Sequence, residues 1–215
     1  MKTDCDFYHN TESYFFKIFA SSNLNSTIQM EQKTQNTALL VMDMQVGIIA
    51  SFPQSAELVN ANKKAIEYAR AQNIPVIFVT VGFRQGGPDV KPNNKGFAAI
   101  RERFANIDMD MFTTVVPELG KKTDELQVMK RALSAFAGSD LEIILRSWGI
   151  KHIVLTGIST SGVVLSTLRE AVDKDYRITV LADCCADVDE EVHRVLTTKI
   201  FPRHADIMTV AEWVE

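Results

Sequence analysis

The sequence predicts an α/β fold: a three-layer α/β/α sandwich, Rossmann-like, around a mostly parallel sheet. Short apolar runs of strand length recur along the chain, segments with helical periodicity lie between them, and cap or turn residues separate the two. Strands that alternate with helices form right-handed crossovers, which give a parallel sheet covered on both faces. The expected strands are 37–42, 76–81, 126–129, 153–157 and 177–182, with a last short one at 207–210.

The first half of this pattern begins with TALLVM, residues 37–42, which is apolar or β-branched throughout and leads into Asp43. Ser55 supplies an N-cap for the helix that follows, and Pro75 lies beyond its end. Residues 82–96 are rich in Gly and Pro and are expected to form a long loop, a type of segment that is often functional. The expected helices are 55–72, 97–104, 140–148, a helix that includes 164–171, and a helix from Asp187 or Asp189 to about 201, followed by a terminal turn at 211–214.

The stretch IVLTGISTSGVVLSTLREA, residues 153–171, predicts a strand, a tight turn and a helix. Gly157 is expected to end the strand. Three hydroxyl side chains, those of Ser159, Thr160 and Ser161, can cap the helix start. In a parallel sheet such a turn lies at the carboxyl end of its strand, where α/β sheets bind ligands, and the helix N-terminus favours negative charge.

Composition limits the classes of function. The chain has 215 residues, 46% of them hydrophobic, with a formal net charge of −4 and a pI near 5.6. A nucleic-acid or anionic-membrane partner is not expected, because both favour basic patches. No apolar run approaches the roughly 20 residues that span a bilayer. The three cysteines suggest no disulfide framework, so a cytoplasmic setting is expected.

Residues 1–36 differ from the rest of the chain, since they are rich in Asn, Ser, Thr and Gln. We expect a flexible N-terminal extension there, followed by one domain over 37–215. Asp4, Asp6 and Glu12 argue against a transit peptide, and the lack of a 7–15-residue apolar core argues against a secretory signal.

Asp43, Lys130 and the turn 157–163 all follow the carboxyl ends of expected strands. They are therefore expected to converge at one edge of the sheet. An Asp beside a Lys in a dry pocket forms an acid/base device, because each charge shifts the proton affinity of the other. The alternative is that Asp43 caps the next segment and Lys130 is solvated, since charged residues are common at strand ends.

Three separated blocks resemble the isochorismatase-like hydrolase superfamily, also called the cysteine hydrolases: ALLVMDMQVGI, VMKRALSAFAGSDLEIILRSWGIKHIVLTGIST and LREAVDKDYRITVLADCCAD. The resemblance covers about residues 37–214. It implies that Asp43 is the acid/base and that Lys130 holds and tunes it. It also implies a cis peptide bond at Ile158–Ser159. The residues it implies for substrate binding or for the turn are Gln45, Ile158, Ser159, Thr160 and Val163.

The usual family turn carries a cysteine nucleophile, and the resemblance places that position at Val163. Valine cannot attack a carbonyl, so the amidase mechanism of the family is not expected here. Isochorismatases also lack the cysteine and cleave a vinyl ether through an Asp acid, but they have glycine at this position. Val81 and Ser159 stand where glutamine and tyrosine are typical of them. The pocket floor is expected to be more apolar than in either branch.

Two functions remain open. The first is a hydrolase that acts on a small-molecule substrate, at a C–N or vinyl-ether bond, by Asp43/Lys130 acid–base chemistry. The second is a non-catalytic family member that serves as a binding or assembly module. No cofactor and no metal are expected, because the 82–96 loop has Asp89 but no His and the four histidines lack ligand spacing. The resemblance implies a homodimer or homotetramer.

Overall fold

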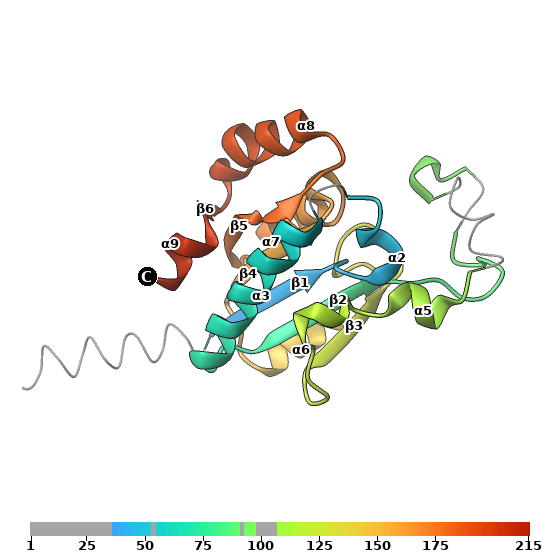
Figure 1. Ribbon diagram of the computed structural model, residues 1–215, viewed down its shortest axis with the longest axis horizontal. Helices are drawn as coiled ribbons and strands as arrows, with labels where there is room; N and C mark the ends of the chain where they lie inside the picture. Colours follow the sequence, from blue (N-terminus) through green and yellow to red (C-terminus); the bar gives the residue numbers. More distant parts are fainter. Residues whose placement is uncertain (1–35, 53–54, 91–92, 98–106) are drawn as a thin grey trace, which may run out of the picture. The chain divides into compact units, whose positions relative to one another are not determined.

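A parallel β-sheet forms the centre of the computed structural model, which describes residues 36–52, 55–90, 93–97 and 107–215 (Figure 1). All pairings between neighbouring strands of this six-stranded sheet are parallel. This confirms the α/β sandwich expected from the sequence. In sheet order the strands are β3 (Leu126–Lys130), β2 (Val76–Val81), β1 (Thr37–Met42), β4 (His152–Ile158), β5 (Arg177–Ala186) and β6 (Asp206–Met208).

The ends of β4 and β5 differ from the sequence prediction. Gly157 does not end β4, because it pairs with Met42 on one side and with Cys185 on the other. A shift in register between Leu155 and Gly157 accommodates this pairing, and both strands run on beyond it. The apolar pattern therefore predicts β4 and β5 to be shorter than they are, because the pairing between them shifts.

Helices connect the strands largely as predicted. Of the two residues predicted to start the helix after β5, Asp187 and Asp189, it is Asp189 that caps α8. Its side chain accepts hydrogen bonds from two backbone N–H groups. The last segment is a short helix rather than a turn. The predicted helix 97–104, apart from Phe97, and the predicted extension 1–36, apart from Asn36, lie outside the described residues. The helices are α2 (Val46–Ile49), α3 (Ser55–Ala71), α5 (Met109–Thr113), α6 (Leu141–Ser147), α7 (Leu165–Asp173), α8 (Glu190–Val195) and α9 (Val210–Val214).

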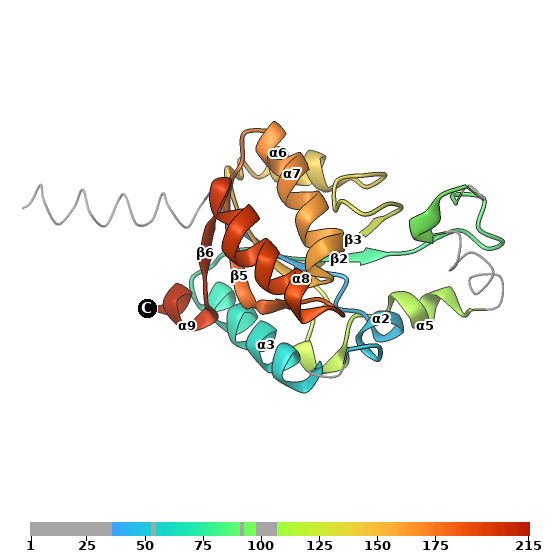
Figure 2. The same cartoon turned by 90° about the horizontal axis from the view of Figure 1, so that it is seen from above.

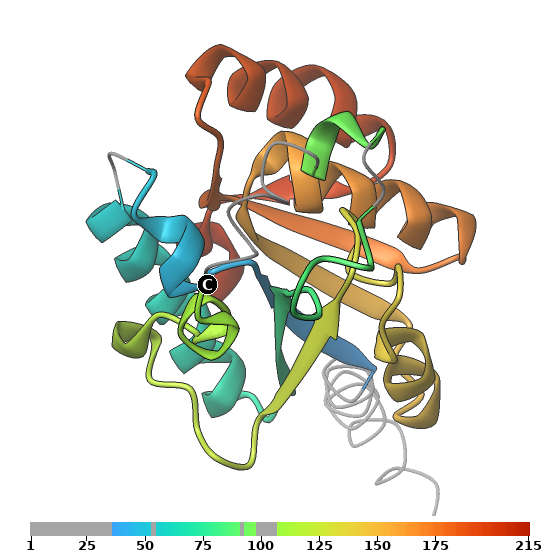
Figure 3. The ribbon, with the colours of Figure 1, turned by 90° about the vertical axis from the view of Figure 1, so that its right-hand side faces the viewer.

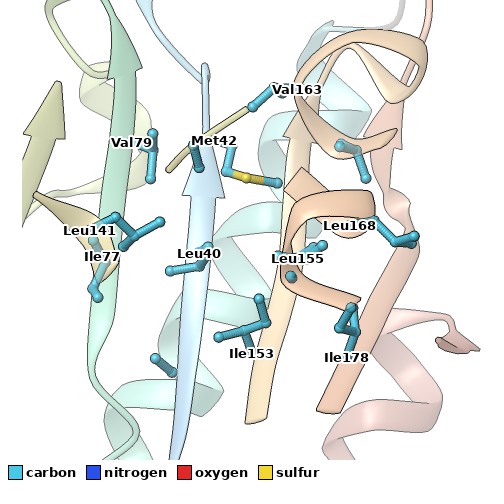
Figure 4. Packing of buried hydrophobic residues seen from close by; sticks show 14 of the residues in the cluster. Leu40, Met42, Ile77, Val79, Leu141, Ile153, Leu155, Val163, Leu168 and Ile178 are labelled. Carbon is cyan, nitrogen blue, oxygen red and sulfur yellow. The ribbon is translucent and has the colours of Figure 1, made fainter. Parts of the chain in front are cut away.

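Two apolar layers hold the helices on opposite faces of the sheet. Figure 2 shows α6 and α7 on one face and α3 and α9 on the other. The first layer packs Leu141 and Leu168 against alternate side chains of β1 and β4. Figure 4 shows this layer, with Val163 at its far end beyond Met42. Among the described residues, no helix has both the length and the apolar character needed to cross a membrane.

The order of the strands creates a switch point between β1 and β4. The chain moves outward from β1 to β2 and β3, and then returns to place β4 on the other side of β1. Ligands of open α/β sheets bind beyond the carboxyl ends of the strands at such a point. Figure 3 faces this edge, with α2 (blue) and α5 (yellow-green) close together in front of the sheet.

Candidate active site

An ion pair between Asp43 and Lys130 lies at the switch point. The Lys130 Nζ atom is 2.9 Å from Asp43 Oδ2, and the side chains are only 1% and 7% exposed. Lys130 Nζ also donates to the carbonyl of Ala132 at 2.9 Å. Asp43 has φ of 54°, a left-handed conformation, and its backbone N–H donates to the carbonyl of Val79. The two residues predicted to converge are thus in contact, and neither is solvated.

The environment of Asp43 suits proton transfer near neutral pH. Burial raises the pKa of its carboxyl from 3.8 to about 6, against the opposing charge and hydrogen bond of Lys130. The second oxygen, Oδ1, makes no hydrogen bond to a described residue. Both residues line a cavity. Asp43 therefore keeps one buried acceptor atom without a hydrogen-bond partner among the described residues, in a side chain that borders the cavity.

The segment after β4 forms the opposite side of the site. Gly157 has φ of 124°, and a Cβ there would lie 1.9 Å from the carbonyl oxygen of Met42, so only glycine lets β4 lie this close to β1. The Ile158–Ser159 peptide bond is cis, as the family resemblance implies. The Ser159 hydroxyl accepts from the N–H of Gly162 and caps the helical turn Thr160–Val164. Ile158 and Ser159 both line the cavity.

Val163 faces the same cavity and is buried, at 2% exposure. Of the described cysteines, Cys184 and Cys185 are both buried and neither lines this cavity. Burial raises the pKa of both thiols, that of Cys185 to about 12. A thiol in that state is not a nucleophile at neutral pH. These two cysteines thus cannot substitute for a nucleophile beside Asp43.

Two of the predicted substrate or turn residues lie behind the cavity rather than on its wall. Gln45 is fully buried: its amide nitrogen donates to the carbonyls of Val81 and Phe112, and its oxygen accepts from Val81 N–H. Thr160 is also buried, and its hydroxyl lies 2.8 Å from His193 Nδ1. Neither residue belongs to the cavity lining. Gln45 joins β2 to α5, and Thr160 joins the turn to α8.

The cavity has a volume of about 810 Å³ and a mainly apolar wall. The sequence pattern pointed to residues at the ends of strands, so it did not identify most of this wall. Phe83 lies two residues beyond β2, in the loop 82–96 that was expected to be functional. Of the residues on the apolar wall, it is the one that the sequence pattern indicated most clearly. The apolar side chains of the wall include Ile48, Phe52, Val81, Phe83, Phe97, Ile107, Met111, Phe112, Leu133, Ile158, Val163 and Val188.

Metal ligands do not gather in the described part of the chain, which holds no group of three or more His, Cys, Asp or Glu side chains placed to bind an ion. Asp89 instead pairs with Arg84.

Comparison with known proteins agrees with this fold. The family model described as "Isochorismatase domain" matches residues 37–212. The chain is 35% identical to an uncharacterized isochorismatase family protein of Bacillus subtilis, over 84% of this chain and 94% of the relative. It is 36% identical to a ureidoacrylate amidohydrolase of Serratia proteamaculans, over 69% of each chain.

A solved structure of an isochorismatase family protein from Burkholderia thailandensis superposes with a TM-score of 0.72. It is 28% identical, and the match covers 83% of this chain and 93% of that one. Since the family model spans most of the chain and the fold agrees with solved members, the chain belongs to the isochorismatase family of hydrolases.

Proposed function

We propose that this protein is a hydrolase of a small molecule in which Asp43 moves the proton and Lys130 holds and tunes Asp43. No cysteine takes part, because Val163 stands where the family resemblance expects one. One observation carries the proposal: the buried carboxylate of Asp43 has one oxygen, Oδ1, without a hydrogen-bond partner in the described part of the chain, and the residue lines a cavity large enough for a ligand. A buried Asp–Lys pair offers little stability over apolar packing, which favours a chemical role.

Cleavage of a C–N bond is the first form of this chemistry, and the amidohydrolase among the relatives supports it. The Asp43 carboxylate takes a proton from water as the water oxygen bonds to the substrate carbonyl carbon. The C–N bond then breaks, and Asp43 returns the proton to the leaving nitrogen. The helical segment that begins at Thr160 favours the negative charge that develops on the carbonyl oxygen.

Cleavage of a vinyl ether is the second form. Here the protonated carboxyl of Asp43 gives its proton to the terminal vinyl carbon, and water adds to the resulting cation. The Asp43 carboxylate takes the proton that this water releases and returns it to the leaving oxygen as the C–O bond breaks. The raised pKa of Asp43, about 6, makes the protonated form accessible just below neutral pH. Both forms use Asp43 and Lys130. They differ in the direction of their pH dependence, because the first needs ionised Asp43 and the second needs protonated Asp43.

A non-catalytic binding module is the second candidate, and Val163 favours it. A buried valine on the cavity wall supplies no nucleophile, and an apolar wall is suited to holding a ligand. A turnover panel read by mass spectrometry separates the two candidates. The panel contains isochorismate, nicotinamide, N-carbamoyl amines and simple amides. Product that gains the elements of water supports the hydrolase, and folded protein without turnover on any compound supports the binding module.

The pH dependence of turnover follows from Asp43. For a C–N substrate the ionised carboxylate is the active form, so kcat/KM is expected to rise with pH through about 6 and then level off. For a vinyl-ether substrate the protonated form is active, so kcat/KM falls with pH through the same value. A pH–rate profile on the substrate found in the panel checks this. A profile that is flat across this region contradicts a role for Asp43 in the rate.

We further propose a cytoplasmic setting and a homodimer or homotetramer. The edge strand β3 supports assembly, because it exposes Leu126 and Met129 and has a strand on only one side in the described sheet. Light scattering on the full chain tests this, and a monomer at all concentrations contradicts it.

A further inference from the structure

The wall of the cavity is mainly aromatic and aliphatic. Four phenylalanines line it, and two of them, Phe83 and Phe97, contact edge to face with ring centroids 5.3 Å apart. Phe83 also belongs to a separate apolar cluster with Val81 and Val90, against which Ile48 packs. This cluster lies outside the two layers that hold the helices on the sheet, so it builds the site rather than the core.

The charged groups at the cavity leave no counter-ion for an anionic ligand among the described lining residues. Lys130 is already paired with Asp43. Asp108 carries a negative charge, and one of its oxygens accepts from the N–H groups that begin α5. Ser159 uses its hydroxyl to cap the next turn. A carboxylate brought into this site meets Asp43 in an apolar environment, which is costly.

The mouth of the cavity is also apolar. Nine large hydrophobic side chains are exposed in the described part of the chain, and four of them line this one cavity. Val188 is 73% exposed and Met111 is 64% exposed, although both border it. Exposed apolar groups gathered at one opening indicate contact with a ligand or a partner. They line the same cavity as Asp43, so an apolar ligand bound there would cover them.

We propose that the substrate carries an uncharged apolar group, an aryl ring or an alkyl chain, beside the bond that Asp43 acts on. The identity of the reacting bond rests on the proposed function, whereas the apolar character of the ligand is inferred from the residues that line the cavity. A volume of about 810 Å³ has room for a phenyl ring and a short chain as well as the reacting group. Small anions are expected to be poor ligands.

Binding of methyl ketones tests this without turnover, because a ketone resembles an amide carbonyl but has no bond to hydrolyse. We expect the Kd, measured by calorimetry on the full chain, to fall about threefold to fourfold for each methylene from butanone to methyl heptyl ketone. Benzylacetone is expected to bind more tightly than methyl propyl ketone. Levulinate has the carbon chain of methyl propyl ketone with a carboxylate at its end, and it is expected to bind more weakly. Equal affinities along the series, or tighter binding of levulinate, overturn the proposal.

A matched pair of surface variants locates the binding. Met111 and Ile143 are each 64% exposed, but only Met111 lines the cavity. Met111→Lys is expected to weaken binding of methyl heptyl ketone about fivefold, and Ile143→Lys to leave it unchanged. If Met111→Lys alters the oligomeric state and not the ketone affinity, the exposed mouth is a contact between copies and the proposal fails. A graded ketone series in a protein that hydrolyses neither the panel nor amides and vinyl ethers with aryl or alkyl groups supports the ligand class and rejects the hydrolase.

Discussion

Gly157→Ala is expected to destabilise the protein by about 4 kcal/mol or more, because two effects act on the same atom. The residue has φ of 124°, which alanine avoids, and its new Cβ would lie 1.9 Å from the carbonyl oxygen of Met42. Relief requires β4 to move away from β1, at the centre of the sheet. Urea denaturation followed by circular dichroism measures the change.

Gly149→Ala is the matched control. Gly149 also has positive φ, at 66°, but nothing lies within 4 Å of an added Cβ. The expected cost is about 1 kcal/mol, from backbone strain alone. Equal costs at the two positions would show that the close approach of the central strands is not what requires glycine at Gly157.

Lys130→Met is expected to cost about 3–5 kcal/mol near pH 8, because it leaves the Asp43 carboxylate buried without its cation. The pKa of Asp43 should then rise above its value of about 6. Its folded pKa already exceeds the unfolded one, so the folded state binds more protons between the two values, and stability rises as pH falls. The loss of stability in Lys130→Met relative to wild type should therefore be smaller at about pH 5 than near pH 8. Denaturant unfolding at the two pH values measures it.

Two controls accompany this variant. Lys151 is exposed, and Lys151→Met is expected to change stability by less than about 0.5 kcal/mol. The double variant with Asp43→Asn and Lys130→Met removes both charges and should be more stable than Lys130→Met alone near pH 8. A double variant no more stable than Lys130→Met would contradict the view that an uncompensated carboxylate causes the loss.

Much of the fold could be predicted because the central strands β1 and β2 are continuous runs of apolar or β-branched residues. β1 and β2 begin and end where their patterns do, at Thr37–Met42 and Val76–Val81. The ends of β4 and β5 could not, since a register shift beyond Leu155 depends on pairing between segments far apart in the chain. The helix α9 was predicted only as a turn, because its five residues are too few to show helical periodicity, although Thr209 and Glu212 form a capping box that marks a helix start.

The site was predictable only in part, for a similar reason. Parallel strands bring their carboxyl ends to one edge, so the convergence of Asp43 and Lys130 followed from their positions after β1 and at the end of β3. The apolar wall has no such rule, because Phe52, Phe112 and Val188 come from connecting segments whose course the pattern does not fix. Nor did the pattern reveal that Gln45 is hydrogen-bonded to backbone behind the cavity.

Asp43 carries the chemistry in the proposed function, and kcat/KM of Asp43→Asn measured beside wild type tests this role. Asp140→Asn is the matched control, since Asp140 is exposed and its side chain makes no capping hydrogen bond. With folding checked by circular dichroism, we expect kcat/KM to fall about 10²–10⁴-fold for Asp43→Asn and to stay unchanged for Asp140→Asn. A folded Asp43→Asn protein that retains wild-type kcat/KM would contradict it and place the chemistry on another group.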